Sequence, residues 1–294
     1  MPTKQKLGAV AGLLAGAVGW GVMWYPYRVL DQAGVSGEVS SFLTYLVASL
    51  LGVLFFFRHL AKFAGVVAIL TVIGVTAGWT NLAYVLAVIG GEVVRVMLLF
   101  YLAPLWTVFF SRLLLGEKVS AQGYLILLIS LSGAVVMLWD AQASLPLPRN
   151  TAEWLALSAG VTFALSNVMT RRAHDLSVSV KSLAIWFGAC LLSMMPVLAA
   201  PQKMAGIFHL SGTVWLLLIG TGVALFLITM AVQYGLTHTP ANQAILIFLS
   251  ELVVAAISSY YLAGEAMGLK EWIGGAMIVV GSLFSGKVDK QNDH

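Results

Sequence analysis

One acidic residue, Glu251, lies in the middle of an apolar stretch that runs from residue 240 to residue 263. About eleven residues separate it from either end, which at about 1.5 Å per helical residue is about 16 Å, the depth of a bilayer midplane. A charged side chain there costs about 3 kcal/mol, so it faces a cavity or the bundle interior. Glu251 therefore fits a substrate contact or a proton carrier, and equally a neutral, hydrogen-bonded structural residue.

Aromatic and amide side chains recur at a similar depth in the other apolar stretches. Such residues can line a cavity for a flat, apolar solute and hydrogen-bond its polar groups. The structural alternative is that Trp and Tyr concentrate at membrane interfaces. The candidate substrate-binding residues are Trp20, Trp79, Asn81, Tyr84, Tyr101, Asn167, Ser250 and Glu251, and Glu251 is also the candidate for ion coupling.

Proline and glycine positions predict how the helices bend and pack. Pro104 falls near the centre of the fourth stretch, where it removes a backbone hydrogen bond and predicts a bend beside Tyr101. Glycines four residues apart allow helices to approach closely, and we expect them to pack within one bundle. This spacing occurs at Gly8, Gly12 and Gly16 and again at Gly74 and Gly78.

Other acidic and basic residues have simpler explanations. Arg95 lies one turn after Glu92, so it either attracts a substrate carboxylate or pairs with Glu92. Glu117 and Glu265 each follow a glycine at a predicted helix end. We interpret both as turn and loop-packing residues.

The chain lacks the patterns that are typical of catalysis or metal binding. HExxH and GxSxG do not occur, and the five histidines fall in predicted loops or tails. We therefore expect no enzymatic activity, no cofactor and no metal. The basic residues behind the net charge of +4 are scattered over separate loops, so nucleic acid is not an expected partner.

These residues belong to elements long enough to cross a membrane. The chain is 60% hydrophobic and only 10% charged, which predicts an all-α integral membrane protein whose partner is the lipid bilayer. Loops are short. The ten predicted transmembrane helices are residues 7–30, 39–57, 64–88, 92–115, 120–140, 151–172, 181–200, 211–236, 240–263 and 268–286.

The sequence contains an internal repeat. Residues 74–133 align without a gap with residues 222–281, and the matching pairs include Gly74 with Gly222, Phe100 with Phe248 and Glu117 with Glu265. Because each half has five crossings, the second half must be inverted relative to the first. We expect two five-helix repeats, residues 1–144 and 150–287, followed by a cytoplasmic tail, residues 288–294.

Lysine and arginine placement predicts the orientation. If the N-terminus is cytoplasmic, eleven of the 16 basic residues fall on the cytoplasmic side. Both termini are then cytoplasmic.

Several short motifs resemble the EamA-type exporters of the drug/metabolite transporter superfamily. In the first half they are Asn81-Leu-Ala-Tyr84, Leu102-Ala-Pro104 and Leu113-Leu-Leu-Gly-Glu117; in the second half they are Leu249-Ser-Glu251 and Leu262-Ala-Gly-Glu265. The likeness covers nearly the whole chain. Many relatives have proline directly after the glutamate that matches Glu251, whereas Leu252 follows it here. Whether the ninth helix has a kink is therefore open.

The resemblance implies a secondary transporter of the bacterial inner membrane that exports small organic solutes, above all aromatic amino acids. The first, third, fourth, sixth, eighth and ninth helices would enclose a central cavity with alternating access. Solute would stack on Trp20, Trp79 and Tyr101 and be oriented by Asn81, Asn167 and Ser250. A facilitative channel or uniporter, or an exporter of other amphipathic metabolites or drugs, stays open, as does a monomer or a homodimer.

Overall fold

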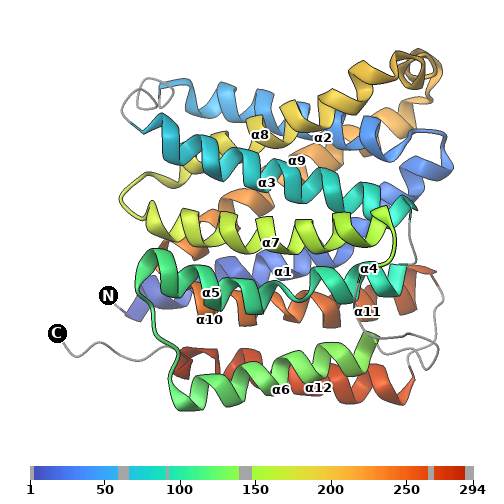
Figure 1. The fold of residues 1–294 in the computed structure, drawn as a ribbon. Coiled ribbons are helices and arrows are strands. Elements are labelled where there is room, and N and C mark those ends of the chain that lie inside the picture. Colours follow the sequence, from blue (N-terminus) through green and yellow to red (C-terminus); the bar gives the residue numbers. More distant parts are fainter. Residues whose placement is uncertain (1–2, 59–65, 91–92, 139–147, 264–267, 289–294) are drawn as a thin grey trace.

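The computed structural model describes residues 3–58, 66–90, 93–138, 148–263 and 268–288. Throughout these ranges the chain is built from helices that lie side by side in one bundle (Figure 1). The α-helices are α1 (Thr3–Gln32), α2 (Gly37–Phe56), α3 (Val67–Gly90), α4 (Val93–Phe100), α5 (Ala103–Leu115), α6 (Ala121–Leu138), α7 (Thr151–Arg172), α8 (Val178–Ala199), α9 (Gly212–His238), α10 (Ala241–Phe248), α11 (Ser250–Ala263) and α12 (Leu269–Leu283). Short 3-10 helices among the described residues include η2 (Pro201–Met204), η3 (Ile207–His209) and η4 (Ser285–Lys287).

Within the described ranges these helices make ten crossings, if α4 with α5 and α10 with α11 each count as one interrupted crossing. Their ends agree with the predicted ends to about four residues. Among the described residues, six crossings are long and apolar enough to span a bilayer: α1, α2, α3, α8, α9 and the α10–α11 pair taken together. The predicted all-α membrane fold is therefore confirmed.

The two halves pack as equivalents. The third crossing of the first half, α3, packs on the first crossing of the second half, α7, and conversely α9 packs on α1. In the same way α4 and α5 lie on α7, while α10 and α11 lie on α1. Equivalent helices also pair with each other, α2 with α8 and α6 with α12. Figure 1 shows α1 and α7 running in opposite directions, as inverted halves require.

Repeat-related glycines occupy equivalent contacts. A Cβ added to Gly74 on α3 would lie 2.5 Å from the carbonyl oxygen of Ala184 on α8. A Cβ added to its repeat partner Gly222 on α9 would lie 2.8 Å from the carbonyl oxygen of Thr44 on α2. Since real Cβ atoms do not approach backbone so closely, both positions need glycine for the helices to pack at this distance.

The glycine spacings identified in the sequence therefore pack helices within the bundle. A Cβ on Gly78 would lie 2.5 Å from the carbonyl oxygen of Gly188, and one on Gly12 would lie 2.6 Å from that of Ala231. The outward faces carry large apolar side chains, such as Leu54 at 67% exposure. Apolar outward faces suit hydrocarbon surroundings.

Candidate functional site

The fourth crossing is broken at the bend predicted from Pro104. α4 ends at Phe100 and α5 begins at Ala103, and between them the amide of Leu102 donates to the carbonyl of Leu99 at 3.4 Å. Pro104 has no amide hydrogen to donate to the carbonyl of Phe100, four residues earlier. That carbonyl lies against α7, where a Cβ added to Gly160 would be only 2.6 Å from its oxygen. Glycine thus lets α7 approach the break.

The ninth crossing is broken at the equivalent place. α10 ends at Phe248, the repeat partner of Phe100, and α11 begins at Ser250. No proline follows Glu251, so the sequence alone leaves a kink here open. The structure forms the break without proline: the Ser250 hydroxyl donates to the carbonyl of Ile247 at 2.5 Å, and Leu252 N–H bonds to Leu249 O at 3.1 Å. A serine hydroxyl commonly satisfies a backbone carbonyl within its own helix in this way.

The start of α11 packs closely against α1. A Cβ added to Gly21 on α1 would lie 2.9 Å from the carbonyl oxygen of Glu251. Each broken crossing therefore rests on a glycine in the first helix of the other half, Gly160 for α4 and α5 and Gly21 for α11. Because each break packs against the first helix of the other half, both breaks are held at the middle of the bundle.

Two predicted site residues meet across the two breaks. The Tyr101 hydroxyl, from the α4–α5 break, is hydrogen-bonded to the Glu251 carboxyl in the first turn of α11. Tyr84 of α3 is close enough to Glu251 to interact with it electrostatically. The Tyr101 ring is 8% exposed. Glu251 thus has a specific partner from the other half, which the sequence did not reveal.

A chain of aromatic rings runs beside this pair. Ring centroids are 5.1 Å apart for Tyr84 and Phe100, 5.5 Å for Phe100 and Phe163, and 5.8 Å for Phe163 and Phe248. Tyr101 meets Phe100 edge to face at 5.3 Å. Such separations are typical of favourable aromatic pairs. This row of rings joins the repeat partners Phe100 and Phe248 through Phe163 of α7.

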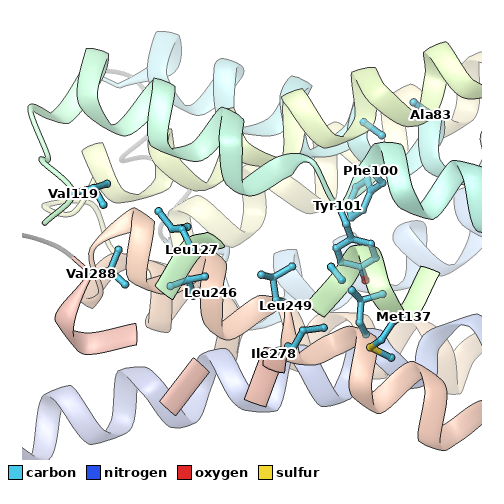
Figure 2. Close-up of a cluster of buried hydrophobic side chains, with 13 residues drawn as sticks. Ala83, Phe100, Tyr101, Val119, Leu127, Met137, Leu246, Leu249, Ile278 and Val288 are labelled. Carbon is cyan, nitrogen blue, oxygen red and sulfur yellow. The ribbon is translucent and has the colours of Figure 1, made fainter. Parts of the chain in front are cut away.

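Figure 2 shows Phe100 and Tyr101 from the first half facing Leu249 and Ile278 from the second half. They belong to the same buried cluster, which Tyr84 and Phe163 join at its edge. Phe100, Phe163 and Phe248 are not among the site residues predicted from the sequence. The signal that was available for two of them is their equivalence in the repeat.

Two other predicted residues, Trp20 and Asn81, lie elsewhere in the bundle. Trp20 packs against a buried cluster from α1, α2, α8 and α9 that includes Met23, Tyr45 and Phe226. Asn81 joins the same region, because its amide donates to the Tyr45 hydroxyl at 3.3 Å. Trp20 and Asn81 thus share a neighbourhood around Tyr45.

Trp79, Asn167 and Ser250 each have a different setting. The Trp79 indole donates to the Ser158 hydroxyl at 3.1 Å, and its side chain is 37% exposed. Asn167 is buried, and its side-chain nitrogen has no hydrogen-bond partner within the described ranges. The Ser250 hydroxyl donates to the carbonyl of Ile247, across the break between α10 and α11. Nothing is described for the side chain of Arg95, and Glu92 and Glu265 lie outside the described residues.

One known protein family matches the chain twice, once in each half. The sequence pattern of the EamA-like transporter family matches residues 7–139 and again residues 150–286. An "uncharacterized transporter" from Archaeoglobus fulgidus is 28% identical over 207 residues, which is 70% of this chain and 72% of that protein. A protein of known crystal structure, 18% identical, superposes over 97% of this chain and 98% of its own with a TM-score of 0.70. That likeness supports the fold alone.

Proposed function

Because the chain belongs to the EamA-like transporter family and is a multi-pass membrane transporter, we propose that it exports aromatic amino acids or related flat metabolites. In this proposal the solute enters from the cytoplasm, binds at the bilayer midplane between the two halves, and leaves outward as the halves rock. The membrane would be the bacterial inner membrane, with both termini in the cytoplasm.

The observation that carries this proposal is the junction of the two helix breaks. There the Tyr101–Glu251 hydrogen bond lies beside the aromatic chain Tyr84, Phe100, Phe163 and Phe248. Aromatic faces favour a flat solute, and the carboxyl and hydroxyl can bind an ammonium group or other donor. Helix breaks at membrane depth are the usual place for transporter binding sites.

Glu251 has two roles in the proposal. As the acidic residue at this depth it contacts the solute, and it is the candidate to carry a coupling proton when export runs uphill. Tyr101 holds its carboxyl from the first half, so a change at Glu251 reaches both halves. Within the family, the proposal takes the bacterial aromatic amino-acid exporter YddG as the protein most like this chain, and the mid-depth tryptophans and tyrosines agree with that choice.

Transport into proteoliposomes tests the substrate. We expect labelled tryptophan, phenylalanine or tyrosine to be taken up and to compete with one another, whereas aliphatic and acidic amino acids should not compete. Tyr101→Ala and Phe163→Ala should each lower aromatic uptake. Tyr124→Ala is the matched control, because Tyr124 on α6 is 53% exposed. Equal uptake of aromatic and aliphatic solutes would contradict the proposal.

A further inference from the structure

Cations seal the helix ends on the side of the bundle where α1 begins, the side predicted to be cytoplasmic. α5, α7 and α9 all end here (Figure 1). The last turn of a helix exposes unpaired carbonyl oxygens and carries a partial negative charge, which favours cations. At each of these three ends a basic side chain from another helix donates a hydrogen bond to a backbone carbonyl. The bonds are Arg172 Nη1 to Leu114 O at 3.3 Å, Lys181 Nζ to Ala173 O at 3.1 Å, and Arg171 Nη1 to Thr237 O at 2.7 Å.

Glu117 ties this layer to the other half of the protein. Gly116 ends α5 in the left-handed conformation, with φ of +69°, and turns the chain so that Glu117 faces the start of α10. One carboxylate oxygen accepts from Ala241 N at 3.0 Å, and the other lies 3.7 Å from Arg171 Nε. A carboxylate at a helix N-terminus beside an arginine is favourably placed.

Buried polar groups complete the arrangement. Lys181 is fully buried and donates to the Thr237 hydroxyl at 2.5 Å, while the Ser111 hydroxyl donates to the Asn242 side-chain oxygen at 2.9 Å. Asn242 is also fully buried. We call Glu117, Arg171, Lys181, Thr237 and Asn242 the inner latch. Glu117 is the member of the latch from the first half, and its partners lie in the second half. Its contacts with Ala241 and Arg171 therefore break if the halves separate on this side.

One face of α7 leads from the midplane to the inner latch. Phe163, Asn167 and Arg171 are spaced four residues apart and therefore lie along the same face. Phe163 touches both Phe100 and Phe248 at the helix breaks, whereas Arg171 pairs with Glu117. Asn167, between them, has a buried side-chain nitrogen with no partner among the described residues. A solute that moves between the midplane and this side would pass Asn167 and then the latch.

The opposite side is joined differently. There the Trp24 indole of α1 donates to the Ser258 hydroxyl of α11 at 2.9 Å, a contact between neutral groups. The Glu38–Lys203 ion pair, at 2.7 Å, joins α2 to η2, which follows α8. Because α2 and α8 are equivalent helices packed on each other, this pair lies beside the pseudo-twofold contact. Among the described residues, the crossings that flank the breaks are therefore tied by charged side chains on the side where α1 begins, and α1 and α11 by a neutral pair on the other.

We propose that the inner latch is a charged gate that holds this side of the transporter closed and favours opening on the opposite side. The inference rests on alternating access in the proposed function, but it does not depend on the identity of the solute. Separating the Glu117 carboxylate from Arg171 and Ala241 exposes charged and polar groups that are now paired at low exposure, which disfavours opening here. Solute binding at the midplane, or loss of one latch member, shifts the balance toward opening.

Thiol labelling tests the gate without any transport measurement. The reporter is Asn167→Cys in a Cys190→Ser background, in sealed vesicles whose orientation is fixed by protease access to an N-terminal tag. A membrane-impermeant maleimide is added from one side or the other. With the latch intact, we expect faster labelling from the side opposite the start of α1.

The latch variants Glu117→Gln and Arg171→Gln should raise the rate of labelling from the α1 side by about tenfold, a modest shift of a two-state equilibrium. Glu271→Gln is the control, since it removes the same charge from a 3.7 Å pair with Lys270 inside one helix, and it should change neither rate. Unchanged rates in both folded latch variants would overturn the proposal. If the variants fail to fold, faster labelling of the intact latch from the α1 side would overturn it as well. Normal gating without aromatic uptake would leave the latch standing and reject only the proposed substrate.

Discussion

Glu251 is held by a residue that precedes it by 150 positions in the chain. Its hydrogen bond to Tyr101 crosses from one half to the other at the point where both broken crossings meet. A typical hydrogen bond contributes about 0.5–1.5 kcal/mol. We therefore expect replacement of Glu251 to alter transport, whereas replacement of a surface acid should not.

Glu251→Gln should abolish the dependence of transport on a proton gradient and lower the uptake rate at least about tenfold, because an amide cannot release or take up the coupling proton. The measurement is initial uptake into proteoliposomes with and without an imposed pH gradient. Glu271→Gln provides the comparison. Uptake that keeps its rate and its response to the gradient would remove the proton-carrier role from Glu251.

Tyr101→Phe keeps the ring and removes only the hydroxyl that donates to Glu251. We expect about a tenfold loss of transport efficiency, corresponding to about 1.4 kcal/mol, with the folded yield unchanged. Tyr124→Phe removes an exposed hydroxyl from α6 and should have no effect. If Tyr101→Phe transports like the unmodified protein, the hydrogen bond has no part in transport.

At the scale of elements, glycines decide how closely helices approach. Gly78→Ala on α3 would place a methyl group 2.5 Å from the carbonyl oxygen of Gly188, and backbone cannot yield as a flexible side chain does. We expect a loss of about 1–3 kcal/mol of stability, measured as a fall of several degrees in the detergent melting temperature. Gly220→Ala on α9 meets open space within 4 Å and should leave stability unchanged or raise it. Equal melting temperatures for the two variants would refute this packing argument.

Hydropathy predicted the crossings well because each must supply about 20 apolar residues, a property written locally in the chain. The break beside Pro104 was predictable for the same reason, since proline acts on its own helix. The break in the ninth crossing was not, because Ser250 and the approach of Gly21 replace proline there. The Ser250 bond is local, but serine does not by itself predict a break, and the contact with Gly21 is tertiary.

The site followed the same rule. Depth in the membrane pointed to Glu251, Tyr84 and Tyr101, which the structure brings together. Depth also pointed to Trp79, whose indole instead bonds Ser158 with its side chain partly exposed. Whether a residue at the right depth reaches the junction depends on how its helix is rotated about its own axis. The sequence fixes that rotation poorly when every face of the helix is apolar. Glu117 shows the converse: interpreted as a turn residue, it bonds three residues of the other half, Arg171, Ala241 and Asn242.

At the scale of the whole molecule, each half packs its third crossing on the first crossing of the other half. This arrangement of inverted halves predicts how solute crosses the membrane. A carrier that alternates between two conformations exchanges internal for external solute faster than it moves solute in one direction, whereas an open pore does not. We expect counterflow: vesicles loaded with unlabelled tryptophan should take up labelled tryptophan transiently above equilibrium. Uptake that never exceeds equilibrium would favour a facilitative channel.

The pairing of α2 with α8 and of α6 with α12 has a consequence for ancestry. Each contact joins a helix to its own repeat counterpart, with glycines on both sides of the α6–α12 seam, Gly133 and Gly274. Two copies of a five-helix precursor, inserted in opposite orientations, would therefore have met through the same helix pairs that now join the halves. Joining the copies in one chain would fix one orientation for each and free Glu251 and Ala103, which are equivalent in the repeat, to differ.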